Sequence, residues 1–105
     1  MISMEAITSV RDRIVEGFHP DRIILFGSYA YGTPHEDSDV DLLVVLPFEG
    51  SPLREQTAIR LAVHSGFSMD VIVYTPQQLQ ERLRLGDSFL REITEKGKIL
   101  YDTTH

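Results

Sequence analysis

The sequence contains no cysteine and no tryptophan, and it has no apolar run long enough to span a membrane. Without cysteine, disulfides and thiolate metal sites are excluded. Basic residues are also few, since 10 Lys and Arg stand against 16 Asp and Glu, for a formal net charge of −6. Proteins that grip the backbone of a nucleic acid normally carry a basic face. The composition therefore argues against membrane insertion and direct nucleic-acid binding, and it predicts a cytoplasmic protein.

What remains is an ordinary mixture of apolar and charged residues over 105 positions, enough for one domain, 1–105, with a modest core. Apolar periodicity predicts helices over 3–18, 28–32, 51–65 and 75–93, the last divided at Gly86-Asp87, and strands over 22–26, 38–46, 67–74 and 98–101. Apolar residues of 51–65 are distributed around much of the helix, so the pattern does not determine which face of this helix is buried. Helices alternating with strands predict an α/β (α+β) fold, with helices packed on a small mixed sheet.

The most informative stretch joins the first two predicted strands. Asp39 and Asp41 stand where the second strand begins. Side chains at i and i+2 of a strand point to the same face, so these two carboxylates project together. Like charges held together favour a cation between them, and carboxylate oxygens suit Mg²⁺. The alternative is a pair of solvated aspartates that cap the loop.

Gly27-Ser28 follows directly after the first strand. Glycine lets the backbone approach a ligand closely, and the amides of a helix start bind anions. A phosphate cradle beside a carboxylate pair is typical of sites that act on a metal-bound nucleotide. The alternative is a plain turn, which needs glycine and a capping serine equally.

A third carboxylate, Asp70, interrupts the otherwise apolar third strand and shares a face with Ile72 and Tyr74. It is either part of the same site or a surface residue on an edge strand. Tyr29 and Tyr31 flank the loop after Gly27-Ser28, and we expect both rings to pack in the core with their hydroxyls at the surface.

Gly27-Ser28, ten residues and then Asp39-x-Asp41 together resemble the signature of the nucleotidyltransferase superfamily related to DNA polymerase β. Within it, the chain resembles the minimal nucleotidyltransferases (MNT proteins), known as antitoxins paired with HEPN-type toxins. The resemblance implies the nucleotidyltransferase fold, with Gly27 and Ser28 on the β- and γ-phosphates. It also implies that Asp39, Asp41 and Asp70 bind Mg²⁺, with two ions expected, and that Asp70 helps to deprotonate the attacking hydroxyl. Many relatives carry Arg where Tyr31 stands, which puts one phosphate contact in doubt.

The resemblance further implies that AMP moves from ATP to a hydroxyl, a tyrosine of the HEPN toxin, and that this silences the toxin. Two alternatives stay open. The chain is a non-catalytic antitoxin that acts by steric contact, or it is a nucleotidyltransferase with a small-molecule acceptor such as an antibiotic hydroxyl. The short length argues against the last, because no second lobe is present to hold such a molecule.

Overall fold

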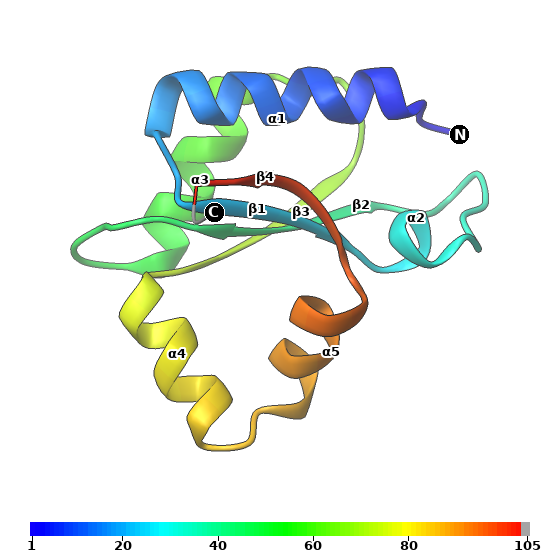
Figure 1. Cartoon of the computed structure of the whole chain (residues 1–105). Helices are drawn as coiled ribbons and strands as arrows, with labels where there is room; N and C mark the ends of the chain where they lie inside the picture. The colour runs from blue at the N-terminus through cyan, green and yellow to red at the C-terminus, as the bar shows by residue number, and fades with distance from the viewer. Residues whose placement is uncertain (104–105) are drawn as a thin grey trace.

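The computed structural model describes residues 1–103, and over these residues five helices and four strands follow one another (Figure 1). In chain order they are α1 (Met4–Phe18), β1 (Arg22–Phe26), α2 (Ser28–Tyr31), β2 (Val40–Val45), α3 (Pro52–Val63), β3 (Met69–Tyr74), α4 (Pro76–Arg84), α5 (Ser88–Lys96) and β4 (Lys98–Asp102). Every predicted helix and strand is present, with small shifts at the ends. The predicted division at Gly86-Asp87 is confirmed, since α4 ends before it and Asp87 caps α5.

The strands form one mixed sheet in the order β3-β2-β1-β4. β1 pairs antiparallel with β2 and with β4, whereas β2 and β3 run parallel. The last residue of β1, Phe26, lies opposite Asp41, and Asp41 in turn lies opposite Asp70. The end of β1 and the beginnings of β2 and β3 therefore meet at one edge of the sheet.

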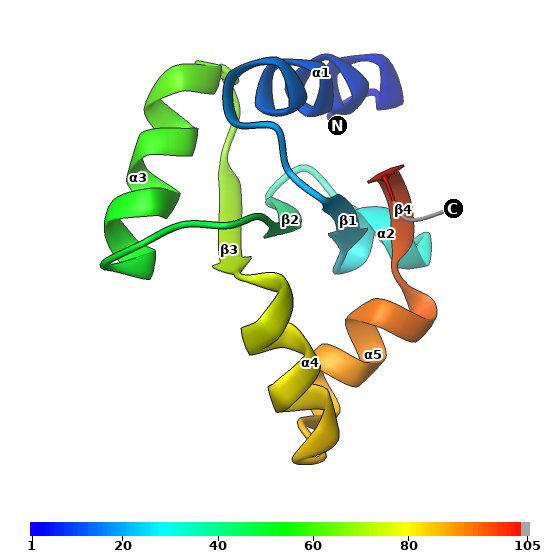
Figure 2. The ribbon, with the colours of Figure 1, turned by 60° about the vertical axis from the view of Figure 1, so that its left-hand side comes forward.

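Helices cover both faces of this sheet (Figures 1 and 2). α1 and α3 lie on one face, over a core that includes Ile23, Leu42 and Val71. α4 and α5 lie on the other face, over a smaller core that includes Ile24 and Leu43. The two central strands, β1 and β2, are buried almost throughout because helices cover both faces of the sheet. The predicted fold class is confirmed.

Local sequence signals fix where the helices begin. Ser3 and Ser51 each accept a hydrogen bond from an amide of the first turn, and Pro52 follows Ser51 at the first helical position. Thr75 and Gln78 form a reciprocal capping box at the start of α4. This cap stabilises the chain reversal that brings α4 back over the face carrying Asp70.

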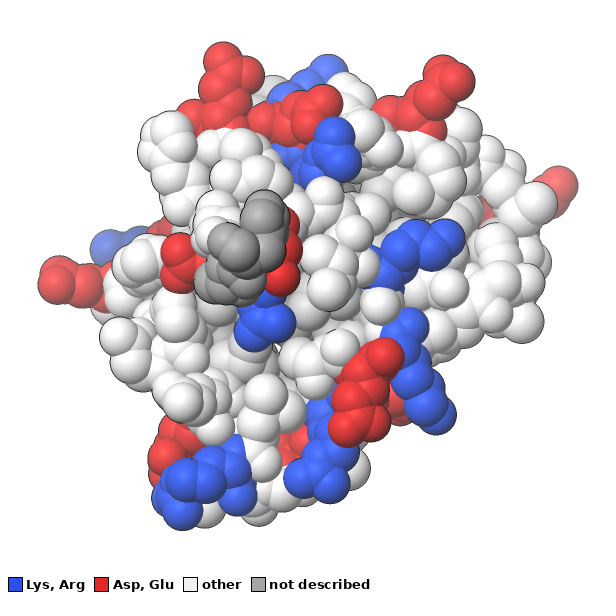
Figure 3. All heavy atoms as spheres, viewed as in Figure 1, with Lys and Arg blue, Asp and Glu red and all other residues white. Residues whose placement is uncertain are grey.

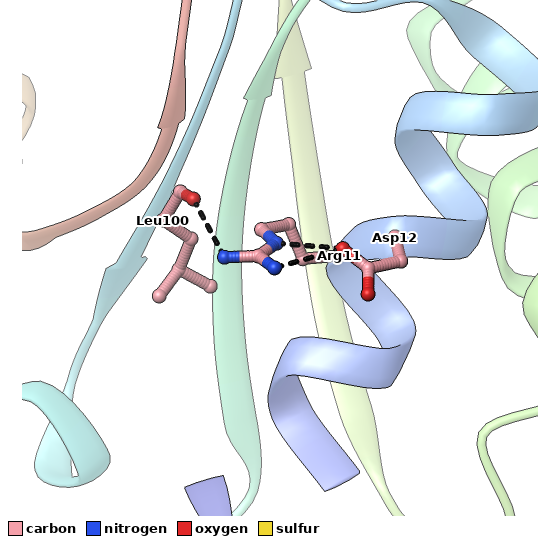
Figure 4. Close-up of polar contacts among 3 residues, drawn as sticks. All are labelled: Arg11, Asp12 and Leu100. Carbon is pink, nitrogen blue, oxygen red and sulfur yellow. Dashed lines mark hydrogen bonds and ion pairs between the residues drawn. The ribbon is translucent and has the colours of Figure 1, made fainter. Parts of the chain in front are cut away.

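The edge strand β4 is tied to α1 by one arginine (Figure 4). Arg11 Nη1 donates a hydrogen bond to the carbonyl oxygen of Leu100 at 3.2 Å. The same guanidinium forms an ion pair with Asp12, with 2.8 Å between Nη2 and Oδ1. This contact joins two segments that lie far apart in the sequence.

Within residues 1–103, none of the helices is both long enough and apolar enough to cross a lipid bilayer.

Candidate functional site

The candidate site lies at the edge of the sheet where β1 ends and where β2 and β3 begin. Asp41 is half-buried on β2, Asp39 stands directly before that strand and is also half-buried, and Asp70 is exposed on β3. Asp41 shares the α4–α5 face with Leu43 and Val45, which pack beneath those helices. The structure thus brings together the three aspartates that the sequence indicated.

Gly27 makes the closest approach to the carboxylates. Its φ is 74°, a conformation that residues with a side chain rarely adopt. A Cβ added at this position would collide with Oδ2 of Asp41. Glycine is therefore required here for two reasons, the backbone conformation and the space that the Asp41 carboxylate takes. The turn after β1 and the carboxylate on β2 form one continuous surface.

Three negative groups close to one another change the acidity of Asp41. Partial burial, the charges of Asp70 and Asp39, and a hydrogen bond with Asp70 raise the pKa of Asp41 to about 6. Burial makes the largest contribution, and the neighbouring carboxylates add to it because like charges disfavour ionisation. Asp41 is the shared member of the group, since both other aspartates act on it. A positive charge placed here would relieve this repulsion.

The donor set fits a hard cation. Within residues 1–103, no three His, Cys, Asp or Glu side chains are arranged to hold a metal ion by themselves. Mg²⁺ is usually held by one or two carboxylates together with the phosphates of a substrate, rather than by an all-protein cage. Asp39 and Asp41 are residues that could supply such a pair, and Asp70 lies opposite Asp41 on the next strand. The site therefore suits an ion that binds together with a nucleotide.

The turn after Gly27 presents backbone amides at the same edge. The carbonyl oxygen of Gly27 accepts the amides of Ala30 and Tyr31 at 3.0 and 3.1 Å, which closes the single turn of α2. The first amides of a helix, here those of Ser28 and Tyr29, have no acceptor inside the helix. They follow directly on the glycine that lies against Asp41, so anion-binding groups and carboxylates are neighbours.

Comparison with known proteins places this geometry in a family. Residues 5–101 match the family model described as a nucleotidyltransferase domain. The chain belongs to the nucleotidyltransferase domain family. It is 32% identical over 80 residues to a protein of Methanocaldococcus jannaschii named as a candidate protein adenylyltransferase, and the match covers 76% of this chain and 77% of the relative. The motif residues Gly27, Ser28, Asp39 and Asp41 all lie inside the region that the family model matches.

Two solved structures share the nucleotidyltransferase fold. A nucleotidyltransferase candidate from Sulfolobus solfataricus superposes with a TM-score of 0.60 at 16% identity, covering 95% of this chain and 80% of the other. A toxin–antitoxin structure with AMP-PNP superposes with a TM-score of 0.56 at 25% identity, covering 98% and 76%. These matches agree with the mixed sheet and the two helical layers of the present chain.

The expectation that both tyrosines pack in the core is wrong for Tyr31, which is 41% exposed. Tyr29 packs against the core, and its hydroxyl accepts the amide of Ile2 at 3.1 Å. Residues two apart on a helix point in nearly opposite directions, so one turn cannot bury both rings. Burial and the charge of Glu92 raise the pKa of Tyr31, whereas a hydrogen bond from the Gly27 backbone lowers it. Tyr31 thus stands beside the turn of the nucleotidyltransferase motif.

Phe89 on α5 also borders the site, and sequence reasoning missed it. Its ring meets the ring of Phe26 edge-on, with 5.8 Å between centroids and 85° between planes, and it stays 53% exposed. Phe26 directly precedes Gly27, so Phe89 adds an apolar border to the turn. The only sequence signal was a large aromatic residue off the buried stripe of α5, which is formed by Leu90 and Ile93.

Charged side chains of both signs alternate over the face shown in Figure 3, where no continuous basic patch is present. Ion pairs also join two basic groups of α4 to acids. Arg82 lies 2.8 Å from Asp87, and Arg84 lies 2.6 Å from Glu81. This face of the nucleotidyltransferase domain offers no continuous track for a phosphate backbone.

Proposed function

We propose that this chain transfers AMP from ATP to a hydroxyl of a partner protein, a tyrosine of a HEPN-type toxin, and acts as its antitoxin. The observation that carries the proposal is the contact between Gly27 and Asp41. A glycine turn that only a Cβ-free residue can form lies directly against a half-buried carboxylate. A phosphate cradle and a cation site are thereby joined at one sheet edge, as transfer from a nucleoside triphosphate requires.

We assign the roles from the positions of these residues. Gly27 and Ser28, at the end of β1, bind the β- and γ-phosphates with backbone amides and a hydroxyl. Asp70, on β3, accepts the proton of the attacking hydroxyl. The hydroxyl oxygen forms a bond to the α-phosphorus while the bond to the bridging oxygen of the β-phosphate breaks. Pyrophosphate then leaves over the turn at Gly27.

Asp39, Asp41 and Asp70 would hold Mg²⁺, with two ions expected. The ion would neutralise charge on the phosphates and keep Asp41 ionised. Burial and the charges of Asp70 and Asp39 raise the pKa of Asp41 to about 6, and this supports the assignment because a bound cation would offset both effects by favouring the ionised carboxylate.

A protein acceptor is supported by the openness of the site and by the relatives. Asp70 and Tyr31 are exposed, so water reaches the carboxylates from outside. Electrostatic catalysis is weak in water and strengthens when a docked surface excludes it. One relative is named as a candidate protein adenylyltransferase, and one structural neighbour is a toxin–antitoxin structure with AMP-PNP. A bound toxin would both close the site and present the hydroxyl.

The test is to purify the chain with a co-expressed HEPN toxin and incubate the pair with Mg²⁺ and ATP labelled on either the α- or the γ-phosphate. We expect the α label, and not the γ label, on a tyrosine of the toxin, and a mass increase of the toxin that Asp39→Asn abolishes. A γ label on the toxin means kinase chemistry and overturns the mechanism. An unlabelled toxin that stays bound identifies a steric antitoxin instead.

A further inference from the structure

The outer edge of β3 carries a hollow that the proposed reaction has not yet used. It has a volume of ≈ 570 Å³ and lies between the start of α3 and the outer side of α4. Pro52 and Gln56 of α3 and Gln77 of α4 line it, and β3 contributes Ile72, Val73 and Tyr74. We call it the β3 groove. Figure 2 shows β3 with α3 and α4 to either side of it.

The floor of the β3 groove is a free strand edge. β3 is the terminal strand of the sheet described over residues 1–103. The carbonyls of Ser68 and Tyr74 accept amides of the β2 side, from Val40 and Leu46, each at 3.1 Å. Backbone groups alternate in direction along a strand, so those of Val71 and Val73 point outward. The Val73 side chain is buried on the opposite face, so its backbone is what borders the groove.

The groove lies along the strand that carries Asp70, and this inference rests on the proposed function. The attacking and leaving oxygens must lie roughly in line through the α-phosphorus. If pyrophosphate leaves over Gly27 at the end of β1, the acceptor arrives from the β3 side, where Asp70 lies. The ribose is bonded to the α-phosphorus through an equatorial oxygen. The nucleoside therefore extends to the side of the line that joins the attacking and leaving oxygens. Tyr74 lines the groove and lies on the same face of β3 as Asp70, four residues away. This spacing corresponds to about 13 Å along the strand.

The charges of the residues that line the β3 groove indicate which kind of ligand it binds. The two charged residues that line the groove are both neutralised within this chain, Glu81 by Arg84 and Arg82 by Asp87. The groove therefore presents no unpaired charge, and it matches a neutral ligand. Gln56 and Gln77 offer amides, which pair with peptide groups, and Ile72 and Tyr74 offer apolar contact.

We propose that an uncharged, extended segment of the partner polypeptide adds to the free edge of β3, with its apolar side chains in the β3 groove, and that this places the acceptor hydroxyl at Asp70. Strand addition uses the outward backbone groups of Val71 and Val73 for affinity and the groove for selectivity. Register along β3, and not a pocket for the acceptor side chain, then determines which hydroxyl of the partner is modified.

The experiment uses the full chain and a synthetic library of uncharged twelve-residue peptides, each with one tyrosine, without ATP or metal. Amide hydrogen exchange is measured residue by residue. We expect peptides from the library to slow exchange at Val71 and Val73 by about tenfold or more, with little change at Ile24 in the middle of the sheet. The double variant Gln56→Lys, Gln77→Lys should weaken binding of the same peptides by about tenfold or more, because it buries charge against a neutral ligand. The matched control Gln80→Lys, on α4 but outside the groove, should bind as the unmodified chain does.

Three results would overturn the proposal. One is a library in which no peptide slows exchange at Val71 and Val73. Another is slowed exchange at Val71 and Val73 with AMP alone, which would make the groove a nucleobase site. The third is protection that grows with the concentration of the chain itself, which would make β3 an edge for a second copy. Because binding is read without ATP, a chain that binds peptides but transfers no AMP refutes the proposed function and leaves the groove assignment standing.

Discussion

The two faces of the sheet are built from the same four strands, and yet they differ in the side chains that they carry. Val40, Leu42 and Val44 of β2 all point to the α1–α3 face and are fully buried. Their neighbours on the α4–α5 face begin with a carboxylate, Asp41, before Leu43 and Val45. β3 repeats the arrangement, with buried valines on one face and Asp70 at the start of the other.

The difference shows how a small domain holds charge at the end of a strand without burying it fully. The α1–α3 face is buried along the whole of β2 and holds the larger core, so it supplies the larger share of the stability. The α4–α5 face is closed only over its middle, by Leu79, Leu90 and Ile93. Its open end leaves room for the three aspartates and the turn at Gly27. One face therefore stabilises the strands, and the other displays the chemistry that they position.

The largest effect expected is on transfer, from a change on the open face. Asp41→Asn keeps the size of the side chain but removes the charge proposed to bind Mg²⁺. Transfer of AMP to the partner should fall on the order of a thousandfold, because loss of a charge-stabilising group costs several kcal/mol in the transition state. The circular dichroism spectrum should not change. Single-turnover transfer of the α label measures the rate, and an unaltered rate would contradict the assignment of Asp41.

The matched change on the closed face should lower stability, whereas the change at Asp41 lowers transfer. Leu42 is fully buried next to Asp41, and Leu42→Ala leaves a cavity that should lower the free energy of unfolding by about 2–5 kcal/mol. Leu53→Ala on α3 serves as the control, because Leu53 is 65% exposed and its loss should cost less than about 0.5 kcal/mol. Urea denaturation measures both. Equal costs at the two positions would mean that the α1–α3 face does not supply the stability assigned to it.

The third prediction separates backbone strain from close approach at the site. Gly27 and Gly32 flank α2 with φ of 74° and 85°, but a Cβ would meet Asp41 only at Gly27 and nothing within 4 Å at Gly32. Gly32→Ala should lose about 1 kcal/mol of stability through strain, because ψ of 17° places Gly32 in the left-handed helical region. Gly27 has ψ of −160°, a region adopted almost only by glycine, so strain in Gly27→Ala should cost about 1–3 kcal/mol. Gly27→Ala should lose about a further 1 kcal/mol and most of its ATP binding, because Asp41 must move.

Isothermal titration with Mg²⁺ and a non-hydrolysable ATP analogue, together with urea denaturation, distinguishes the two glycines. If the two alanine variants bind the nucleotide equally well, the contact between Gly27 and Asp41 has no part in the site.

Much of this comparison was accessible from sequence, because strand alternation is a local property. The alternation placed Asp70, Ile72 and Tyr74 on one face of β3, and the structure confirms it. The inward face of α3 was not accessible, since apolar residues surround that helix. Ile59 and Val63 are buried, whereas equally apolar neighbours stay exposed. Which of them turn inward depends on packing against α1 and β3, which no local pattern records.

The parts that the sequence left open, missed or got wrong share this cause. The residues alone left open whether Asp70 joins Asp39 and Asp41, because its parallel pairing with Asp41 joins segments far apart in the sequence. The contact of Phe89 with Phe26, which was missed, also joins distant segments. Tyr31 was expected in the core because it is aromatic, but the single turn of α2 directs it outward. The β3 groove likewise exists only once α3 and α4 stand on opposite sides of the edge strand. Local sequence patterns predict the helices and strands, whereas contacts between distant segments form the site.

The smallest effect is a pH dependence confined to the open face. The pKa of Asp41 in the folded chain, about 6, lies above its ordinary value of 3.8. As the pH rises between these values, the unfolded chain releases its proton first, so the folded state is progressively destabilised. Without metal, Asp41→Asn should therefore match the unmodified chain near pH 4 and exceed its stability above pH 7. We expect a gain of about 1 kcal/mol, because the half-exposed carboxylate is screened by solvent.

Urea denaturation between pH 4 and pH 8 measures this gain, with Asp37→Asn, a change in the exposed loop between α2 and β2, as the control. Saturating Mg²⁺ and nucleotide should reverse the sign at pH 7, since ligands that bind the folded state stabilise only the chain that holds them. This reversal is expected because the charge of Asp41 destabilises the open face in the empty site and is also the charge proposed to bind Mg²⁺. A difference that does not vary with pH would show that the pKa of Asp41 is the same in the folded and the unfolded chain, and that its neighbours do not oppose its charge.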